Sequence, residues 1–348
     1  MNEAMWREAV HFAKSAFVPW RDIDGSTFLV TGATGLIGSA LVYTLLARAE
    51  MTDNPPSVIA CVRNREKGTR VFGSLANSNR LSFLVQDAID PINHSQPVDY
   101  IVHAASMTSS KSFVEKPVEV IRTTIDGTSR ILEYAQSVSP NAKVVFLSTM
   151  EIYGDGDGSV ISESNYWPIN PLLVRNSYPE SKLIAESLCC SYAAEYGVDV
   201  RIVRLAQSWG PNVPDDDNRV FAYFARCARE GNDIVLATPG LSRRMYVYSY
   251  DAATAILVSL AKGKAGNAYN VANDSTYCSI VEMAELVSRE IAHGSINVRF
   301  SSSENVGRFA GYHQLNLDTT KIVDLGWHAE RGLTEMYSMI VDGNHAEI

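Results

Sequence analysis

Tyr178 and Lys182 are the two residues whose types and spacing most directly suggest chemistry. They stand four residues apart in the segment Asn176-Ser-Tyr-Pro-Glu-Ser-Lys182, so both side chains project from one face if this segment is the first turn of a helix. A phenol has a pKa of about 10 and is a poor base at neutral pH. A nearby ammonium group favours the phenolate and lowers that pKa. The pair can then act as the general base for a hydroxyl group, although Tyr-x-x-x-Lys also occurs on solvated helices without any catalytic role.

A glycine-rich turn follows the first apolar strand of the chain. The strand Thr27–Thr31 leads into Gly32-Ala-Thr-Gly-Leu-Ile-Gly38 and then into a helical pattern from Ser39 to Arg48. In this context the first glycine permits a tight turn, the second lets backbone amides approach a pyrophosphate, and the third allows close helix packing. The helix N-terminus then faces the phosphates. The turn predicts a dinucleotide site that is formed by Gly32, Thr34, Gly35, Leu36, Ile37 and Gly38.

The residue after the second strand bears on the kind of dinucleotide. Arg63 directly follows the strand Ser57–Val62. An Asp or Glu usually stands in this region, about 20 residues beyond the glycines, to hold the ribose 2′-hydroxyl of NAD. A guanidinium suits the 2′-phosphate of NADP instead, and it equally fits a solvated loop of mixed charge. The cofactor is therefore predicted to be NAD or NADP. The positive charge of an oxidised nicotinamide ring would lower the pKa of Tyr178 further.

Strands and helices alternate along the first two thirds of the chain. Further apolar strands are expected at 81–87, 99–105 and 143–149, with a helix at 118–137. This alternation predicts an α/β fold with a Rossmann-type doubly wound parallel sheet, whose ligands bind beyond the carboxyl ends of the strands. Thr149 and Tyr178 would both lie at that edge. The residues predicted to line the cofactor there are Asp87, Ala88, Ala104, Ala105 and Ser106.

The chain is predicted to divide into three parts. Residues 1–26 form an N-terminal helical extension, in which Met5 to Phe17 has the pattern of an amphipathic helix. Residues 27–205 form the Rossmann domain, and residues 206–348 form mainly a smaller α/β substrate lobe, with some segments returning to the first domain. Beyond 205 the expected helices are 221–230, 250–261, 280–292 and 333–341, and the expected strands are 234–236, 268–271 and 297–300.

Composition argues against several classes of protein. The net charge of -9 disfavours a nucleic-acid partner, which needs a basic surface. The five cysteines include no Cys-x-x-Cys pair and no neighbouring histidines at metal-ligand spacing, so we expect no metal and buried free thiols. We see neither a membrane-spanning apolar run nor a signal sequence. A cytoplasmic protein is expected.

The order and spacing of several motifs resemble the extended short-chain dehydrogenase/reductases. The resemblance covers roughly residues 27 to 340 and is greatest to the epimerase/dehydratase family that acts on nucleotide sugars. It rests on the glycine turn, Asp87, His103-Ala-Ala-Ser106, Ser148-Thr149, Tyr178-x-x-x-Lys182, Trp209-Gly-Pro211, Ser242 to Asp251 and Leu325-Gly-Trp327.

The resemblance implies roles for matching residues. Tyr178 would be the catalytic acid and base, Lys182 would bind the nicotinamide ribose and tune Tyr178, and Thr149 would hydrogen-bond the sugar oxygen that is oxidised. Hydride would leave C4 of the hexose and give a 4-keto sugar. The substrate would be a nucleotide-activated sugar, and helices near 113–137 and 180–196 would form a homodimer.

The segment Thr149-Met150-Glu151 bears on the fate of the keto sugar. The family's 4,6-dehydratases have an acid where Met150 stands, and methionine cannot donate a proton. Epimerases have a small or apolar residue there, which suits Met150. The uronate decarboxylases resemble this chain at Glu151, Arg175 and Arg244, and an arginine beside the substrate carboxylate suits their chemistry. Predicted substrate contacts are Thr149, Glu151, Arg175, Gln207, Arg219 and Arg244, and Glu151 is also a candidate catalytic base.

Four functions follow from these residues. The leading prediction is an NAD(P)-dependent nucleotide-sugar epimerase that transiently oxidises C4 of a hexose or uronic acid. The first alternative is a uronate decarboxylase of the UDP-glucuronate type, and the second is an NADPH-dependent 4-keto-sugar reductase, which Arg63 would suit. A non-catalytic cofactor-binding protein is an alternative of another class, but it would have no need of Tyr178 beside Lys182.

Overall fold

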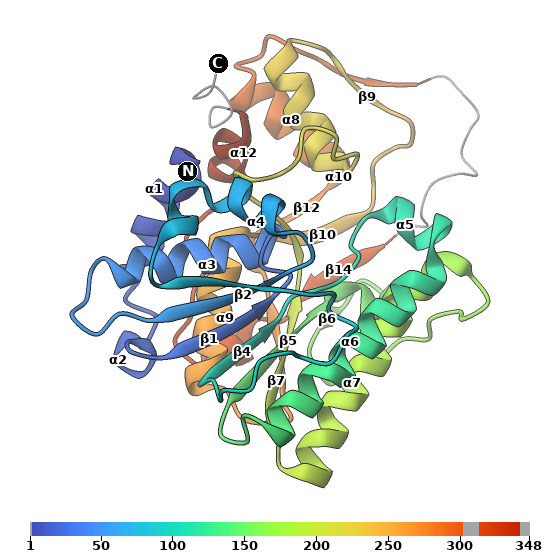
Figure 1. Cartoon of the computed structure of the whole chain (residues 1–348). Coiled ribbons are helices and arrows are strands. Elements are labelled where there is room, and N and C mark those ends of the chain that lie inside the picture. The colour runs from blue at the N-terminus through green and yellow to red at the C-terminus, as the bar shows by residue number, and fades with distance from the viewer. Residues whose placement is uncertain (1, 302–312, 342–348) are drawn as a thin grey trace.

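The central element is a seven-stranded parallel sheet with the strand order β11-β7-β5-β4-β1-β2-β3 (Figure 1). It is described here from a computed structural model that covers residues 2–301 and 313–341. The order runs outward in opposite directions from β1 and β4, so the switch point of the sheet lies between these two strands. The strands are β1 (Thr27–Thr31), β2 (Ser57–Val62), β3 (Leu81–Val85), β4 (Tyr100–His103), β5 (Lys143–Thr149), β7 (Asp199–Leu205) and β11 (Ala268–Val271).

Both faces of this sheet are buried, which confirms the predicted doubly wound fold. Alternate strand residues enter different cores because successive side chains point to opposite faces. Phe28 and Val30 pack with α3 (Leu36–Ala49) and α9 (Ser249–Lys262). Leu29 and its neighbours on that face pack with α6 (Pro117–Ser137) and α7 (Ser177–Tyr196). The apolar strands carry few polar residues for this reason.

The C-terminal part forms a smaller α/β lobe, as predicted. A second sheet has the order β12-β10-β14-β6, with β8 paired to β10, and β13 pairs with β9. The strands of these two small sheets are β8 (Gln207–Trp209), β9 (Ile234–Leu236), β10 (Arg243–Tyr248), β12 (Asn273–Ser279), β13 (Val298–Phe300) and β14 (Gln314–Leu317), together with β6 (Val160–Ile161) from the first part of the chain. The helices are α8 (Val220–Glu230), α10 (Ile280–Leu286), α11 (Thr320–Val323) and α12 (Leu333–Val341), with a π-helical turn, η4 (Val287–Ile291).

The strand β11 bears on the predicted domain boundary at residue 205. It pairs with β7 in the first sheet, and α9 packs on α3, so two segments beyond 205 belong to the Rossmann layers. The boundaries at 26 and 205 remain predictions. Met1, residues 302–312 and residues 342–348 of the predicted parts lie outside the described residues.

The N-terminal extension differs from the predicted single helix Met5–Phe17. The helix α1 (Glu3–Phe12) ends at Phe12, with Ala13 as its C-cap, and a short α2 (Trp20–Ile23) follows. The indole of Trp20 donates to the carbonyl oxygen of Ser15 at 3.0 Å, which holds the segment after α1 in a non-helical turn. The chain therefore turns so that Phe12, Val18, Trp20 and Ile23 all enter one core.

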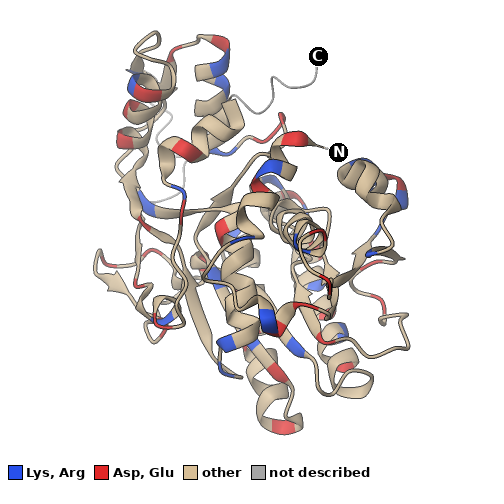
Figure 2. Ribbon diagram, turned by 90° about the vertical axis from the view of Figure 1, so that its left-hand side faces the viewer, with Lys and Arg blue, Asp and Glu red and all other residues tan. Residues whose placement is uncertain are grey.

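Two further observations concern the surface and the thiols. Figure 2 shows basic and acidic residues interspersed along the ribbon. None of the helices in the described part of the chain is long and apolar enough to cross a membrane.

Cys61, Cys189 and Cys227 are buried as expected, whereas Cys190 is exposed and Cys278 is partly buried. The prediction for Cys190 was wrong because its position on α7 faces away from the sheet that buries Cys189.

Candidate active site

Tyr178 and Lys182 lie in the first two turns of α7, at the carboxyl end of β5. Both are almost fully buried. The Nζ of Lys182 donates to the carbonyl oxygen of Leu147 on β5 at 2.7 Å and lies 4.6 Å from the centroid of the Phe146 ring. Thr149, at the end of the same strand, is hydrogen-bonded to the Tyr178 side chain. The structure thus brings together Thr149, Tyr178 and Lys182, three of the four residues that are predicted to be catalytic, and the fourth is Glu151.

The pKa of Tyr178 differs from the simple expectation for a Tyr–Lys pair. Burial raises the pKa of this phenol, and the charge of Glu151 raises it further, while Thr149, Arg175 and Arg219 act in the opposite direction. Burial also lowers the pKa of Lys182 to about 7, and its Nζ lies 5.9 Å from the Tyr178 ring centroid. Burial therefore opposes charge on both groups, and the activation of Tyr178 by Lys182 together with an oxidised nicotinamide stays a prediction.

Two short turns beside α7 supply predicted substrate contacts. Arg175, in the 3₁₀ turn η3 (Val174–Asn176), forms an ion pair with Glu151 at 2.7 Å. Glu151 belongs to η2 (Met150–Tyr153), which follows β5. Because both ion-pair partners influence the pKa of Tyr178, this pair lies close to the candidate base. Met150 points elsewhere, since it is buried in the main hydrophobic core.

The remaining predicted contacts come from the second lobe. Arg219 forms hydrogen bonds with Asp217, and its Nε lies 3.0 Å from both carboxylate oxygens. The positive charge of Arg219 also lowers the pKa of Tyr178. Arg244 lies on β10, and its buried Nε has no hydrogen-bond partner among the described residues. Gln207 lies on β8, opposite Tyr246 of β10, two residues beyond Arg244. A buried guanidinium nitrogen without a partner suits an anionic ligand.

Sequence reasoning missed a buried network behind the site. Glu186 lies one helical turn beyond Lys182 on α7 and accepts from Ser148 at 2.5 Å. It also pairs with Arg204 of β7 at 2.7 Å, and Arg204 donates to the Tyr153 hydroxyl at 2.8 Å. The network ties β5, α7 and β7 together directly behind Thr149. The four-residue spacing of Tyr178, Lys182 and Glu186 is the sequence signal that could have revealed it.

The glycine turn has the geometry that a dinucleotide requires. Gly32 has φ 63°, and a Cβ there would lie 2.6 Å from the backbone of Ala104. A Cβ on Gly38 would lie 2.2 Å from the carbonyl oxygen of Gly32. Gly35 caps α3 without any side-chain hydrogen bond, so the first N–H groups of this helix can meet a pyrophosphate. The residues present therefore fit the predicted cofactor.

Other predicted cofactor residues surround this turn. Ser106 has a buried hydroxyl without a partner among the described residues, while Ala104 and Ala105 follow β4 against Gly32. His103 is buried as expected, with Nδ1 2.7 Å from the Thr31 hydroxyl, and burial lowers its pKa to about 3. The imidazole is thus neutral and structural.

Arg63 and Asp87 lie where the adenosine end of the cofactor is expected. Arg63 is exposed after β2. Asp87 follows β3 and accepts from the backbone N–H of Ile89 at 3.3 Å, and Ala88 beside it is buried. Both residues lie at the same edge of the sheet as the glycine turn, in agreement with their predicted neighbourhood.

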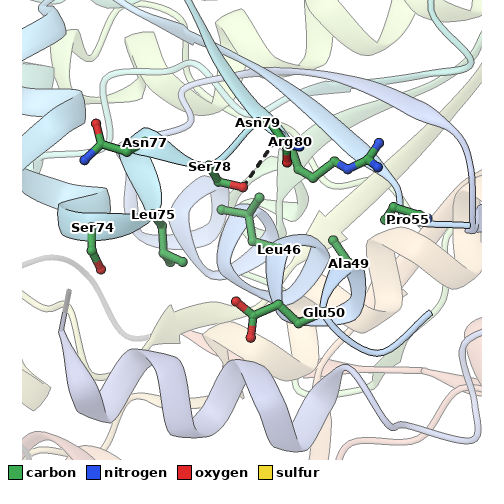
Figure 3. Close-up of a pocket in the computed structure, with 10 residues that line it drawn as sticks. All are labelled: Leu46, Ala49, Glu50, Pro55, Ser74, Leu75, Asn77, Ser78, Asn79 and Arg80. Atoms are coloured by element: carbon green, nitrogen blue, oxygen red, sulfur yellow. Dashed lines mark hydrogen bonds between the residues drawn. The ribbon is translucent and has the colours of Figure 1, made fainter. Parts of the chain in front are cut away.

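A hollow elsewhere on the molecule is separate from these residues. It lies between the end of α3 and η1 (Gly73–Asn77), where Figure 3 shows Leu46, Glu50 and Leu75 at its wall. None of the predicted site residues lines it. Among the residues in 2–301 and 313–341, no cluster of His, Cys, Asp and Glu could hold a metal ion; absence of a metal remains a prediction.

Known proteins resemble this chain in both sequence and structure. The NAD dependent epimerase/dehydratase family matches residues 28–272. UDP-glucuronic acid decarboxylase 3 of Arabidopsis thaliana is 29% identical over 308 residues, which cover 88% of this chain and 85% of that protein. UDP-glucuronic acid decarboxylase 1 of Xenopus tropicalis is 28% identical over 78% of this chain and 62% of its own length.

Two solved structures illustrate the structural similarity. A dTDP-glucose 4,6-dehydratase from Streptomyces venezuelae with NAD bound has a TM-score of 0.76 at 25% identity, covering 92% of this chain and 97% of its own. A UDP-glucuronic acid 4-epimerase from Bacillus cereus, in complex with UDP-glucuronic acid and NAD, has a TM-score of 0.75 at 22% identity, covering 91% of this chain and 98% of its own. At 22% identity, the similarity to the UDP-glucuronic acid 4-epimerase shows a shared fold alone.

Proposed function

Because this chain belongs to the NAD-dependent epimerase/dehydratase family, we propose that it oxidises C4 of a nucleotide-linked uronic acid and then releases the sugar carboxylate as carbon dioxide. The observation that carries this proposal is the Glu151–Arg175 ion pair, 2.7 Å long, beside the candidate base. Arg244, whose buried Nε has no hydrogen-bond partner in the described part of the chain, is the second cation that a carboxylate could meet. The relatives named above are UDP-glucuronic acid decarboxylases.

The first step would be the loss of a proton and a hydride at C4. Tyr178 would take the proton of the C4 hydroxyl, and Thr149, already hydrogen-bonded to Tyr178, would hold the same oxygen. Bound NAD would supply the hydride acceptor, and its positive charge would oppose the burial that raises the pKa of Tyr178. Lys182 would bind the nicotinamide ribose. The predicted cofactor residues between Gly32 and Ser106 would hold the remainder of the dinucleotide.

The second step would follow from the keto sugar itself. Oxidation at C4 places a carbonyl group two bonds from the carboxylate carbon, and the electrons of the breaking C5–C6 bond pass into that carbonyl as carbon dioxide leaves. Tyr178 would donate a hydrogen bond to the developing oxyanion. The enolate would then take a proton at C5. Return of the hydride from the reduced cofactor to C4, with the proton given back by Tyr178, would yield the nucleotide-linked pentose and restore NAD. Arg175 and Arg244 would orient the carboxylate until it departs.

Epimerisation at C4 is the second candidate, and it needs the same oxidation. It requires Thr149, Tyr178 and Lys182 but no decarboxylation. Met150, the residue that favoured an epimerase in the sequence, is buried in the core, which leaves Glu151 and Arg175 as the residues that distinguish the branches. We further propose a cytoplasmic homodimer, in which α6 and α7 carry the contact between subunits.

One experiment separates these reactions. The purified protein is incubated with UDP-glucuronate labelled with ¹³C at the carboxyl carbon, and products are followed by NMR. Labelled carbon dioxide and a nucleotide-linked pentose would support the proposal. A C4 epimer that retains the label would reject decarboxylation in favour of the epimerase. Consumption of added NADPH with a 4-keto substrate, without either product, would favour the reductase.

A further inference from the structure

His313 is fixed next to Arg244 at the start of β14. Its carbonyl oxygen accepts from the backbone N–H of Arg243 at 2.9 Å, and its own N–H donates to the Ser242 hydroxyl at 3.3 Å. The adjacent residues pair in parallel, with Leu315 opposite Arg244. The side chain is largely buried, at 22% exposure. Hydrogen bonds with Ser242 and Arg243, the two residues before Arg244, therefore fix the backbone of His313.

Asp155 orients the imidazole of His313. The Nδ1 of His313 lies 2.8 Å from Oδ1 of Asp155, a distance at which an Nδ1–H donates to a carboxylate. A backbone hydrogen bond of 3.2 Å from Gln314 to the carbonyl oxygen of Asp155 holds the two segments together. Asp155 follows η2, the turn that contains Glu151. With Nδ1 engaged, Nε2 is the ring nitrogen that can meet a ligand.

The charged groups around His313 are those of the candidate substrate site. Burial lowers the pKa of His313, and so do the charges of Arg244 and Arg175, whereas Asp155 and Glu151 raise it. Glu151 and Arg175 also act on the pKa of Tyr178, so His313 and the candidate base share the same two neighbours. The imidazole thus lies within electrostatic reach of two arginines, Arg244 and Arg175, that belong to the candidate substrate site.

We propose that His313, oriented by Asp155, is a third anion-binding side chain of the substrate site and holds an anionic oxygen of the sugar nucleotide as an imidazolium. The oxygen belongs to the sugar carboxylate or to the diphosphate. This inference rests on the proposed function, since it needs a sugar nucleotide in the site. An anion placed between His313 and the two arginines offsets their repulsion, so the imidazole gains a proton when the anion binds.

Proton uptake on binding tests this directly. The full chain is titrated with UDP-glucuronate by calorimetry near pH 7.5, in buffers with different ionisation enthalpies. The wild type should take up a fraction of a proton. His313→Gln should lose this uptake and bind about tenfold more weakly, as expected for the loss of one charge-assisted hydrogen bond. Asp155→Asn should reduce the uptake, because the imidazolium loses its carboxylate partner.

His11→Gln is the matched control. His11 also forms a His–carboxylate pair, with Glu330 at 2.7 Å, but it lies on α1, and no predicted site residue is its partner. This variant should keep both the affinity and the proton uptake. Uptake and affinity that persist unchanged in His313→Gln would overturn the inference while leaving the proposed function intact.

Two further ligands identify the oxygen that is bound. UDP carries the diphosphate alone, and UDP-glucose carries it with an uncharged sugar. Proton uptake with UDP-glucuronate only assigns His313 to the carboxylate, and equal uptake with all three assigns it to the diphosphate. Should the wild type bind none of the three, the proposed function and this inference both fail.

Discussion

The ring of Phe113 lies parallel to the ring of Tyr178, with 4.4 Å between their centroids and 8° between their planes. Phe113 belongs to α5 (Ser110–Glu115), and its carbonyl oxygen accepts from the hydroxyl of Ser177 on α7 at 3.2 Å. The guanidinium of Arg175 lies over the ring of Phe113, 5.5 Å from its centroid. One face of the candidate base is therefore shielded from water by a residue that no sequence motif identified.

Removal of this shield should change the pH dependence of turnover. Burial is the main cause of the raised pKa of Tyr178, so Phe113→Ala, which exposes the phenol, should lower that pKa. The rise of kcat/KM with pH should consequently move to lower pH. Val114→Ala on the same short helix alters an exposed side chain and should leave the profile in place. A profile that Phe113→Ala does not move would mean that the ring does not set the basicity of Tyr178.

Loss of the Tyr178 hydroxyl alone should abolish most of the turnover. Tyr178→Phe keeps the aromatic ring that stacks on Phe113, so the fold and cofactor binding should persist. The expected loss of kcat is roughly 10²–10⁴-fold, the usual contribution of a general acid–base group. Tyr196→Phe, at the exposed end of α7, is the control. Full turnover in Tyr178→Phe would remove Tyr178 from the reaction.

Cofactor affinity should depend on the protonation of Lys182. Its pKa is lowered to about 7 by burial, against the charge of Glu186, so the ammonium is lost as pH rises through that value. The affinity for NADH, measured by its fluorescence, should then decline by at most about tenfold per pH unit. Lys182→Met should bind weakly at every pH. Lys143→Met, at the opposite end of β5, should retain the wild-type dependence.

The Glu186–Arg204 pair should be a major determinant of stability. Arg204 is 3% exposed, and Glu186 supplies its carboxylate partner. Glu186→Gln leaves a buried guanidinium without its counter-charge and should lower the free energy of unfolding by about 3–5 kcal/mol, measured with urea. Glu133→Gln removes a comparable but exposed pair with Arg130 and should change stability little. Equal effects from both substitutions would contradict a special role for the buried pair.

The sheet and the glycine turn were predictable because their signals are local. The strands Ser57–Val62 and Lys143–Thr149 were predicted with the bounds that the structure has, since both are apolar runs buried on two faces. The turn Gly32–Gly38 combines a positive φ with close backbone contacts that only glycine allows. The positions of Tyr178 and Lys182 on one helix follow from their spacing alone.

The remaining features depend on contacts between distant parts of the chain. Phe113 contacts Tyr178, 65 positions later in the sequence, and Asp155 contacts His313, 158 positions later. The periodicity of apolar residues does not predict contacts between such distant positions. The raised pKa of Tyr178 is a consequence of that packing, so the sequence could suggest only the influence of Lys182. The early end of α1 likewise follows from how Trp20 docks into the core.

Asp251 should make the stability of the protein depend on pH. Its buried carboxylate accepts from the backbone N–H groups of Glu330 at 2.8 Å and Arg331 at 3.0 Å. Burial raises its pKa from 3.8 to about 7, although both hydrogen bonds lower it. The folded state therefore holds this proton more tightly than the unfolded state. The resulting stabilisation is fully present below the unfolded pKa and is lost as pH rises through about 7.

The asparagine variant isolates this contribution. Asp251→Asn resembles the protonated carboxyl group at every pH. Between pH 4 and 8 the free energy of unfolding of the wild type should therefore fall relative to that of the variant. A shift of roughly 4 kcal/mol corresponds to a difference of about three pKa units. Urea unfolding at one-unit intervals measures it, and Asp53→Asn, at an exposed position, should show no such shift. A constant difference across this range would mean that Asp251 is ionised throughout and that the two backbone N–H groups outweigh its burial.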